Sequence, residues 1–297
     1  KLRAAEDVWF GAPIVEPDIA VIKPTTSQIC SWQWEAVTRV MGRVHELLYG
    51  RNYHYVIIPE EHVVSRREPL SQFKAIVLPN ASHFPPGLTD RLLPWVEQGG
   101  TLISVGIAGG FTPYGEEDGA LMNELFGPLT YQPWFEYGES GWLLRIPELA
   151  PDVHVDGKKL ASVLSSPHGA GRALLINDLQ LSGENGDRLC EWIDRSAPRR
   201  AWVGQNALEM NLRENDDGLF ITLINPDLHD VAAATVHVTG TFSSAIDRGI
   251  EGGWPVPLER KDEMTSFKTM LAPGEGTLIH LRQPANPRPS VETEGIM

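Results

Sequence analysis

Short apolar runs alternate with amphipathic segments between residues 15 and 110 of the chain. Each apolar run has the length and composition of a buried strand, and each ends at a proline or a glycine. Strands are predicted at residues 18–23, 53–58, 74–78 and 101–105, and helices at 31–49 and 88–98. Strands that are apolar on both faces and alternate with helices are typical of a parallel sheet covered on both sides. The pattern therefore predicts a doubly wound α/β sheet of the Rossmann or flavodoxin type, with right-handed crossovers.

The pattern is looser from residue 115 to residue 168. A short helix is predicted at 120–126, ahead of a stretch rich in proline, glycine and aromatic residues with strands at 143–146 and 160–165. A core strand at 171–175 and a closing helix at 183–196 follow. We interpret this second half as an irregular edge of the same sheet.

Beyond residues 197–200 the hydrophobic period changes to two. Strands are predicted at 219–225, 232–238, 242–246, 267–271 and 276–281, the first two of them as a hairpin. Turn-forming residues separate these strands at 215–218, 225–227, 252–253 and 272–274. Short strands with such turns and no helix between them predict a small antiparallel β-sandwich.

The chain is thus predicted to contain two domains, in line with 297 residues at about 150 residues per domain. An α/β domain is expected over residues 1–200 and the β-sandwich over residues 201–282. The stretch Ala197-Pro198-Arg199-Arg200 has the composition of an exposed linker between them. Residues 283–297 contain three prolines and show no periodicity, so they are predicted to form a disordered tail.

Charge excludes two classes of partner. Lys and Arg total 25 against 39 Asp and Glu, which gives a net charge of -14 at pH 7. Nucleic-acid backbones and anionic lipid surfaces both require a basic face, so neither is expected as a partner. No apolar run approaches the roughly 18 residues that a membrane span requires, so no membrane association is expected.

Two cysteines, Cys30 and Cys190, are too few for a disulfide framework or for a zinc site made of thiolates. We interpret both as reduced thiols, which favours a reducing compartment such as the cytoplasm. The sequence begins at Lys1 rather than at a methionine. We interpret this as the loss of a tag, of the initiator alone or of an entire upstream domain.

The order of several segments resembles a known family. In the α/β part these are a strand with its proline at 73–80, a helix with Gly-Gly at 92–100 and a strand at 101–106. In the β part they are the strand at 219–225 and the ending at 271–278. Over residues 15–282 the chain resembles the class I glutamine-amidotransferase-like domain of family 42 glycoside hydrolases, the β-galactosidases, and the small β-sandwich that follows it.

The resemblance implies an assembly role, since this domain of the family is called the trimerisation domain. The family's catalytic carboxylates lie on an N-terminal (β/α)8 barrel. No eightfold alternation of strand and helix is present in this sequence. A barrel would therefore lie outside this chain, joined to it in cis or supplied in trans.

Amidotransferase-like folds become enzymes through a Cys or Ser on a strained turn after a sheet strand. By the resemblance this turn is residues 105–110, and the nucleophile position falls at Ile107 or Ala108, after Gly106. Neither side chain can attack a carbonyl. We therefore expect a degenerate nucleophile elbow and no glutaminase or peptidase activity. The glycines of the turn also lack the G-x-G-x-x-G spacing of a dinucleotide site, and no cofactor is expected.

Metal-binding patterns are absent from the nine histidines, with no H-x-x-x-H or H-E-x-x-H, so no metal is expected. Glu60-Glu61-His62, just after the second strand, is either a carboxylate–imidazole pair or a solvated turn, and we favour the turn. Glu116-Glu117-Asp118 is either a catalytic acidic group or a complement to a helix macrodipole, and we favour the second.

Large aromatic residues gather in predicted loops: Trp32, Trp34, Trp134, Phe135, Tyr137 and Trp142. Such side chains suit a core beneath long loops, an interface between subunits or stacking on a sugar ring. All three roles stay open, and the aromatic residues are candidates for interface or sugar contacts.

The leading hypothesis is a non-catalytic oligomerisation and accessory region of a β-galactosidase-like glycoside hydrolase, forming a homo-oligomer that the resemblance implies is a trimer. The alternative is a stand-alone protein that binds a small ligand or a carbohydrate at the strand ends, beside a degenerate amidotransferase-like site. A third hypothesis is an active hydrolase with an unrecognised site.

Overall fold

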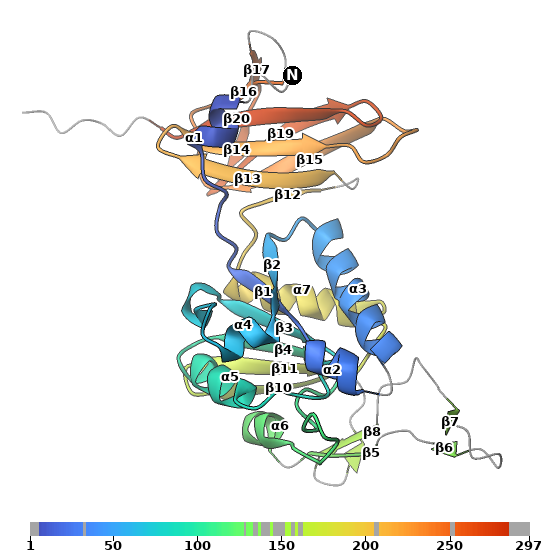
Figure 1. The fold of residues 1–297 in the computed structure, drawn as a ribbon. Coiled ribbons are helices and arrows are strands. Elements are labelled where there is room, and N and C mark those ends of the chain that lie inside the picture. Colours follow the sequence, from blue (N-terminus) through green and yellow to red (C-terminus); the bar gives the residue numbers. More distant parts are fainter. Residues whose placement is uncertain are drawn as a thin grey trace, which may run out of the picture. The chain divides into compact units, whose positions relative to one another are not determined.

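The computed structural model describes residues 6–31, 34–127, 129–132, 136–137, 143–144, 152–155, 158–159, 163–204, 208–249 and 253–284. The chain forms two compact units (Figure 1). Residues 17–199 form an α/β unit, and residues 200 onward form a β unit together with the segment before residue 17.

The α/β unit is built on a six-stranded sheet with the order β10-β11-β4-β3-β1-β2. Its strands are β1 (Ile19–Lys23), β2 (Tyr55–Pro59), β3 (Ala75–Pro79), β4 (Thr101–Val105), β10 (Val163–His168) and β11 (Gly171–Ile176). All neighbours pair in parallel except β10, which pairs antiparallel with β11 at one edge. The order of the five parallel strands, 2-1-3-4 and then the last, is that of flavodoxin-like folds. The predicted doubly wound α/β fold is confirmed.

Helices cover both faces of this sheet (Figure 1). They are α2 (Thr25–Cys30), α3 (Trp34–Gly50), α4 (Glu60–Val64), α5 (Leu88–Glu97), α6 (Ala120–Phe126) and α7 (Glu184–Ser196), with a 3-10 turn at Leu70–Gln72. Successive side chains of a strand point to opposite faces, so Ile76 of β3 joins the core under α4, α5 and α6. Its neighbour Val77 joins the core under α3 and α7. These two cores explain why the strands are apolar on both faces.

Two local predictions in this unit are corrected. Residues 25–30, which lie ahead of the helix predicted at 31–49, form the separate helix α2. The segment after α6 is more than an irregular edge of the main sheet. It contributes β10, but β5 (Leu129–Gln132), β8 (Asp152–Val155) and β9 (Lys158–Lys159) form a sheet of their own, and β6 (Glu136–Tyr137) pairs with β7 (Leu143–Leu144).

The β unit is a sandwich of two antiparallel sheets, as predicted. One has the order β12-β15-β19-β18 and the other β13-β14-β20-β16-β17. Their bounds are β12 (Ala201–Val203), β13 (Glu209–Asn215), β14 (Gly218–Ile224), β15 (Ala232–Thr239), β16 (Ser244–Asp247), β17 (Trp254–Val256), β18 (Glu259–Lys261), β19 (Met264–Leu271) and β20 (Gly276–Arg282). Ile221 of β14, Val236 of β15 and Phe267 of β19 meet in the core between the sheets.

The predicted hairpin of residues 219–225 with 232–238 is wrong, because β14 and β15 belong to different sheets. β14 instead pairs with β13 and β20. Asn225, at the start of the connection, is buried, and its Nδ2 donates to the carbonyl oxygens of Asp230 at 2.8 Å and Leu271 at 3.3 Å. These bonds satisfy the backbone where the chain passes from one sheet to the other.

The N-terminal segment groups with the sandwich, whereas the predicted domain range of 1–200 places it with the α/β sheet. Helix α1 (Glu6–Gly11) packs Val8 against Phe220 and Leu278 on the outer face of the five-stranded sheet. The N–H of Val15 then donates to the carbonyl of Leu212 at 3.1 Å. The predicted disordered tail, 283–297, lies outside the described residues except for its first two.

Candidate functional site

Ligands of doubly wound folds bind at the carboxyl edge of the parallel strands, where the strand order reverses. In this sheet the reversal lies between β1 and β3. The loops at this edge are those that follow β1, β2, β3, β4 and β11. We therefore consider this edge, including the turn after β4, as the candidate site.

The turn after β4 is closely packed. Gly106 has φ +80°, and a Cβ on it would lie 2.8 Å from Leu179 Cδ2 and 3.0 Å from Asn80 Oδ1. Its N–H donates to the carbonyl of Ile176 at 2.8 Å. Glycine is therefore required here by both conformation and space.

Ile107 and Ala108, at the position where an active amidotransferase-like fold would carry its nucleophile, are buried in the core under α4, α5 and α6. The N–H of Gly109 donates to the carbonyl of Ala81 at 2.8 Å. The turn therefore presents apolar side chains that face the protein interior.

Glu60 is the unexpected residue at this edge. It begins α4 directly after β2 and is fully buried, so the solvated turn favoured from the sequence is wrong for it, whereas Glu61 is exposed. The N–H of Thr26 donates to Glu60 Oε1, and Oε2 has no hydrogen-bond partner among the described residues. Burial raises the pKa of Glu60 to about 7. Among the described residues, no hydrogen bond or ion pair joins His62 to either carboxylate.

The loop after β1 is also tied to the loop after β3. The N–H of His83 donates to Ser27 Oγ, and the Ser27 hydroxyl donates to the His83 carbonyl, both at 2.9 Å. The His83 ring stacks on Phe111 with ring centres 5.2 Å apart, and burial lowers its pKa. The loops after β1, β2 and β3 are thus fastened to one another at the point where a ligand would enter.

One contact at this edge resembles part of a catalytic apparatus. Ser82 Oγ lies 3.0 Å from Nδ1 of the adjacent His83. A serine nucleophile requires its base to be oriented by a further group and to face oxyanion donors. Within the described part of the chain, no carboxylate is bonded to the His83 ring. The pair alone therefore does not make a hydrolytic site.

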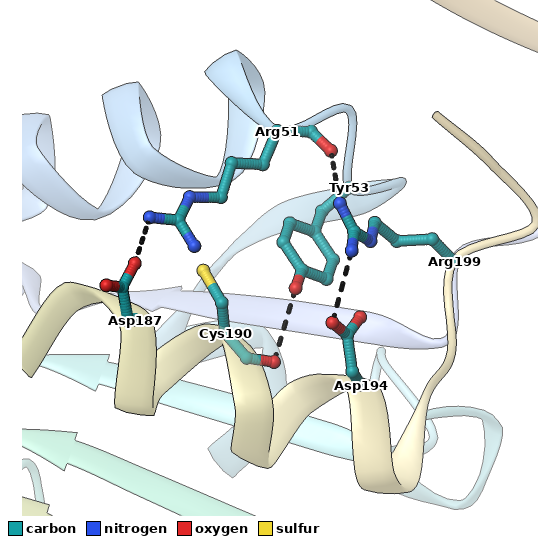
Figure 2. A network of polar contacts seen from close by, with 6 residues as sticks. All are labelled: Arg51, Tyr53, Asp187, Cys190, Asp194 and Arg199. Carbon is teal, nitrogen blue, oxygen red and sulfur yellow. Dashed lines mark hydrogen bonds and ion pairs between the residues drawn. The ribbon is translucent and has the colours of Figure 1, made fainter. Parts of the chain in front are cut away.

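Cys190 lies on α7 and not in one of the loops at the carboxyl edge of the sheet. It belongs to a polar network between α7 and the segment before β2 (Figure 2). Burial raises the pKa of its thiol, so the thiolate needed for nucleophilic attack is disfavoured. The Tyr53 hydroxyl donates to the Cys190 carbonyl at 3.2 Å. Cys30 is half-buried in α2 and, like Cys190, is a free thiol.

Arg199 completes this network, as Figure 2 shows. Its guanidinium lies 4.9 Å from the ring centre of Tyr53 and donates to the Arg51 carbonyl and to Asp194, both at 3.3 Å. Arg51 in turn pairs with Asp187 in the first turn of α7. The network fastens α7 to the connection between α3 and β2, which is a structural role.

The aromatic candidates are placed only in part. Trp34 begins α3 with 48% of its surface exposed, and Ile29 of the neighbouring α2 is 77% exposed. Tyr137 lies in β6. Trp32, Trp134, Phe135 and Trp142 lie outside the described residues. The described part of the chain therefore places two exposed apolar side chains, Ile29 on α2 and Trp34 on α3.

The acidic run ends directly before Gly119, the residue that precedes α6. Asp118 Oδ1 accepts hydrogen bonds from the N–H groups of Gly119 at 2.9 Å and Ala120 at 3.0 Å, at the start of α6. Asp118 thus lies beside the N-terminus of α6, but the first turn of this helix holds no acidic residue, and the macrodipole interpretation stays a prediction. In the described part of the chain, no group of three or more His, Cys, Asp or Glu residues is arranged to hold a metal ion. Nor is any described helix both long and apolar enough to cross a membrane.

Comparisons with known proteins find neither a protein-family model nor a curated protein that matches the sequence. Solved structures do match. A family 42 β-galactosidase from G. stearothermophilus has a TM-score of 0.63 at 13% identity, over 91% of this chain and 41% of that one. The β-galactosidase from Bacillus circulans sp. alkalophilus has a TM-score of 0.60 at 14% identity, over 95% and 43%.

Alpha-L-fucosidase isoenzyme 2 from Paenibacillus thiaminolyticus has a TM-score of 0.61 at 9% identity, over 95% of this chain and 51% of that one. At such identities the likeness shows the fold, and the resemblance to family 42 β-galactosidases is confirmed at that level. The chain spans about half or less of the length of each of these proteins. Because the names of these proteins give two different activities, the fold alone does not identify a substrate.

Proposed function

We propose that this chain is a non-catalytic assembly and accessory region of a β-galactosidase-like glycoside hydrolase. Its catalytic barrel lies outside the chain, in cis or in trans. One observation carries the proposal: both units match family 42 β-galactosidases over 91% of this chain, but over only 41% of the enzyme. The chemistry of the parent protein would be retaining hydrolysis by two carboxylates about 5 Å apart on the barrel.

The residues at the carboxyl edge of the sheet support the proposal that this chain is not catalytic. Its elbow carries Ile107 and Ala108 in place of a nucleophile, and both are buried. The loops after β1, β2 and β3 are joined through Glu60 and Ser27, which leaves the alternative of a ligand at the strand ends less favoured. These contacts support a scaffold rather than a binding cleft at this edge.

Exposed apolar side chains support assembly through the α/β unit. Ile29 and Trp34 expose apolar surface on two helices that pack together. An interface of about 1,600 Å2, at about 25 cal/mol per Å2 of apolar surface, has ample gross driving force before the cost of association is subtracted. A homo-oligomer, a trimer by resemblance, would cover this pair.

Catalytic silence is tested by assaying the purified chain against aryl galactosides and against glutamine. The proposal predicts no turnover above the buffer blank for either substrate. An activity that follows the protein through successive purification steps would contradict it. The intact mass of the natural gene product tests the separate point of whether a barrel belongs to the same polypeptide.

A further inference from the structure

A cavity of about 690 Å3 lies on the outer face of the five-stranded sheet of the sandwich. Helix α1, the turn of residues 215–217 between β13 and β14, and side chains of β14, β16 and β20 line it. All of these elements belong to one compact unit. The cavity is therefore defined without reference to the α/β unit.

The floor of the cavity is a row of three cross-strand neighbours. In the sheet register, His280 of β20 lies opposite Phe220 of β14 on one side and Ile246 of β16 on the other. The Phe220 and His280 rings stack with centres 4.2 Å apart and an angle of 17°. Val8 of α1 packs against Phe220 and walls one side. Phe220 and Ile246 of the floor and Val8 of the wall are apolar, and strand pairing fixes the three floor residues.

His280 contributes a fixed hydrogen-bond acceptor. It is buried, and its Nε2 lies 3.1 Å from the carbonyl oxygen of Asp217. A carbonyl only accepts, so Nε2 carries the hydrogen and donates it. Burial lowers the pKa of His280, and the positive charges of Arg282 and Arg248 add to this effect. In the neutral ring, Nδ1 is left as an acceptor.

Two guanidinium groups line the same cavity. Arg282 follows His280 by two positions on β20 and is exposed on the same face. Arg248 follows Ile246 by two positions, and its N–H donates to the carbonyl of Leu278 at 2.7 Å. No ion pair to Arg282 is found within the described ranges. Arg282 therefore places a positive group in this hollow, on a chain whose net charge is -14.

We propose that this cavity binds an acidic saccharide, a pyranose ring that carries a carboxylate. A guanidinium group recognises a carboxylate through paired, charge-assisted hydrogen bonds, which the exposed Arg282 supplies. The ring hydroxyls need acceptors as well as donors, and these are the exposed Asp216 and Asp217 of the rim and Nδ1 of His280.

The apolar floor and wall accept the C–H face of such a ring. A simple inorganic anion would use the arginines but would leave the rim carboxylates facing a like charge. The acidic saccharide satisfies all three groups of side chains, and this is why we favour it over phosphate.

The test is calorimetric titration of the purified full chain with galacturonate, galactose and inorganic phosphate. We expect galacturonate to bind at least tenfold more tightly than either of the other two. Arg282→Gln should weaken galacturonate binding about tenfold or more, because a charged hydrogen bond is lost. Lys261→Gln, which removes the same charge from an exposed position on β18, should leave the affinity unchanged.

Gly11→Leu gives a second variant that retains both arginines. Gly11 lines the cavity, and a Cβ on it would meet no atom within 4 Å, so we expect the protein to fold and the added side chain to reduce galacturonate binding. Circular dichroism of each variant verifies folding. The proposal is overturned if galacturonate fails to bind at about 10 mM. Equal binding of galactose or phosphate, or an equal loss in Lys261→Gln, would also overturn it.

Discussion

Gly106 turns the chain at the end of β4 with a positive φ, and the two side chains that follow it are buried and apolar. The lack of a nucleophile at these positions can be read from the sequence, because Ile107 and Ala108 have apolar side chains. The burial of Glu60 could not be predicted from the sequence. It depends on α2, and the polar residues 25–27 at the start of this helix give no helical pattern. The local sequence pattern thus identifies the turn after β4, but not the contact between Thr26 and Glu60 at the same edge of the sheet.

Glu60 should make the stability of the α/β unit depend on pH. Its pKa is raised from an ordinary 4.5 to about 7 in the folded protein, so the folded state favours the protonated form. The stabilisation is complete below about pH 4.5 and is lost as pH rises through about 7. The free energy of unfolding should therefore fall between pH 5 and pH 8, by no more than about 3 kcal/mol from this group.

Glu60→Gln retains an oxygen acceptor for Thr26 and removes the titration. Urea unfolding of this variant should show less pH dependence than the parent, with its relative gain growing toward pH 8. Glu61→Gln, an exposed neighbour, is the matched control and should behave like the parent. Identical pH profiles for Glu60→Gln and the parent would show that this carboxylate does not titrate as described.

At the scale of elements, the hydrophobic pattern predicts the bounds of a helix or strand well where the burial of its residues is regular. β4 and α6 have the bounds that the sequence predicts, because β4 is buried along its whole length and α6 has one clear buried side. β13 was missed because its sequence, EMNLREN, alternates only two apolar residues with charged and amide groups. The pairing of β14 was also missed, since strand order depends on contacts between sheets rather than on the turn that follows a strand.

The polar network around Tyr53 should hold α7 in place. Arg199→Ala removes two hydrogen bonds and the contact with the Tyr53 ring, together worth about 1–2 kcal/mol. Hydrogen exchange of amides in α7 should then accelerate about fivefold or more. Arg195→Ala, on the same helix, loses only a pair at 3.9 Å between exposed side chains and should change exchange little. Equal protection in both variants would mean that the network does not stabilise the helix.

At the scale of the molecule, the chain passes between the two units twice, near residue 17 and near residue 200. Limited proteolysis should cut at 197–200, or in the tail beyond 283, before it cuts inside either unit. Because residues 6–16 group with the sandwich, the fragments from a single cut at 197–200 should stay together through a gel-filtration column. Early cleavage within 74–105 would contradict both the boundary and the buried central sheet.

Assembly is the other property of the whole molecule. The net charge of -14 opposes the approach of identical chains, so apolar burial must lead any stable contact. Trp34→Ala should therefore weaken self-association, as should Trp32→Ala and Trp134→Ala if those side chains lie at the contact. Tyr114→Ala, another strongly exposed aromatic residue of the α/β unit, is the matched control and should leave the assembly intact. Equal loss in both Trp34→Ala and Tyr114→Ala would mean that the contact is not specific to α2 and α3.

The central claim, that this chain is an assembly region, is tested most directly by multi-angle light scattering of the purified protein at low and at high salt. Salt screens the repulsion between like-charged chains, so the account predicts an oligomer whose mass is unchanged or larger as salt rises. A trimer would agree with the role carried by the resemblance. A monomer at every salt concentration, at tens of micromolar protein, would contradict the account.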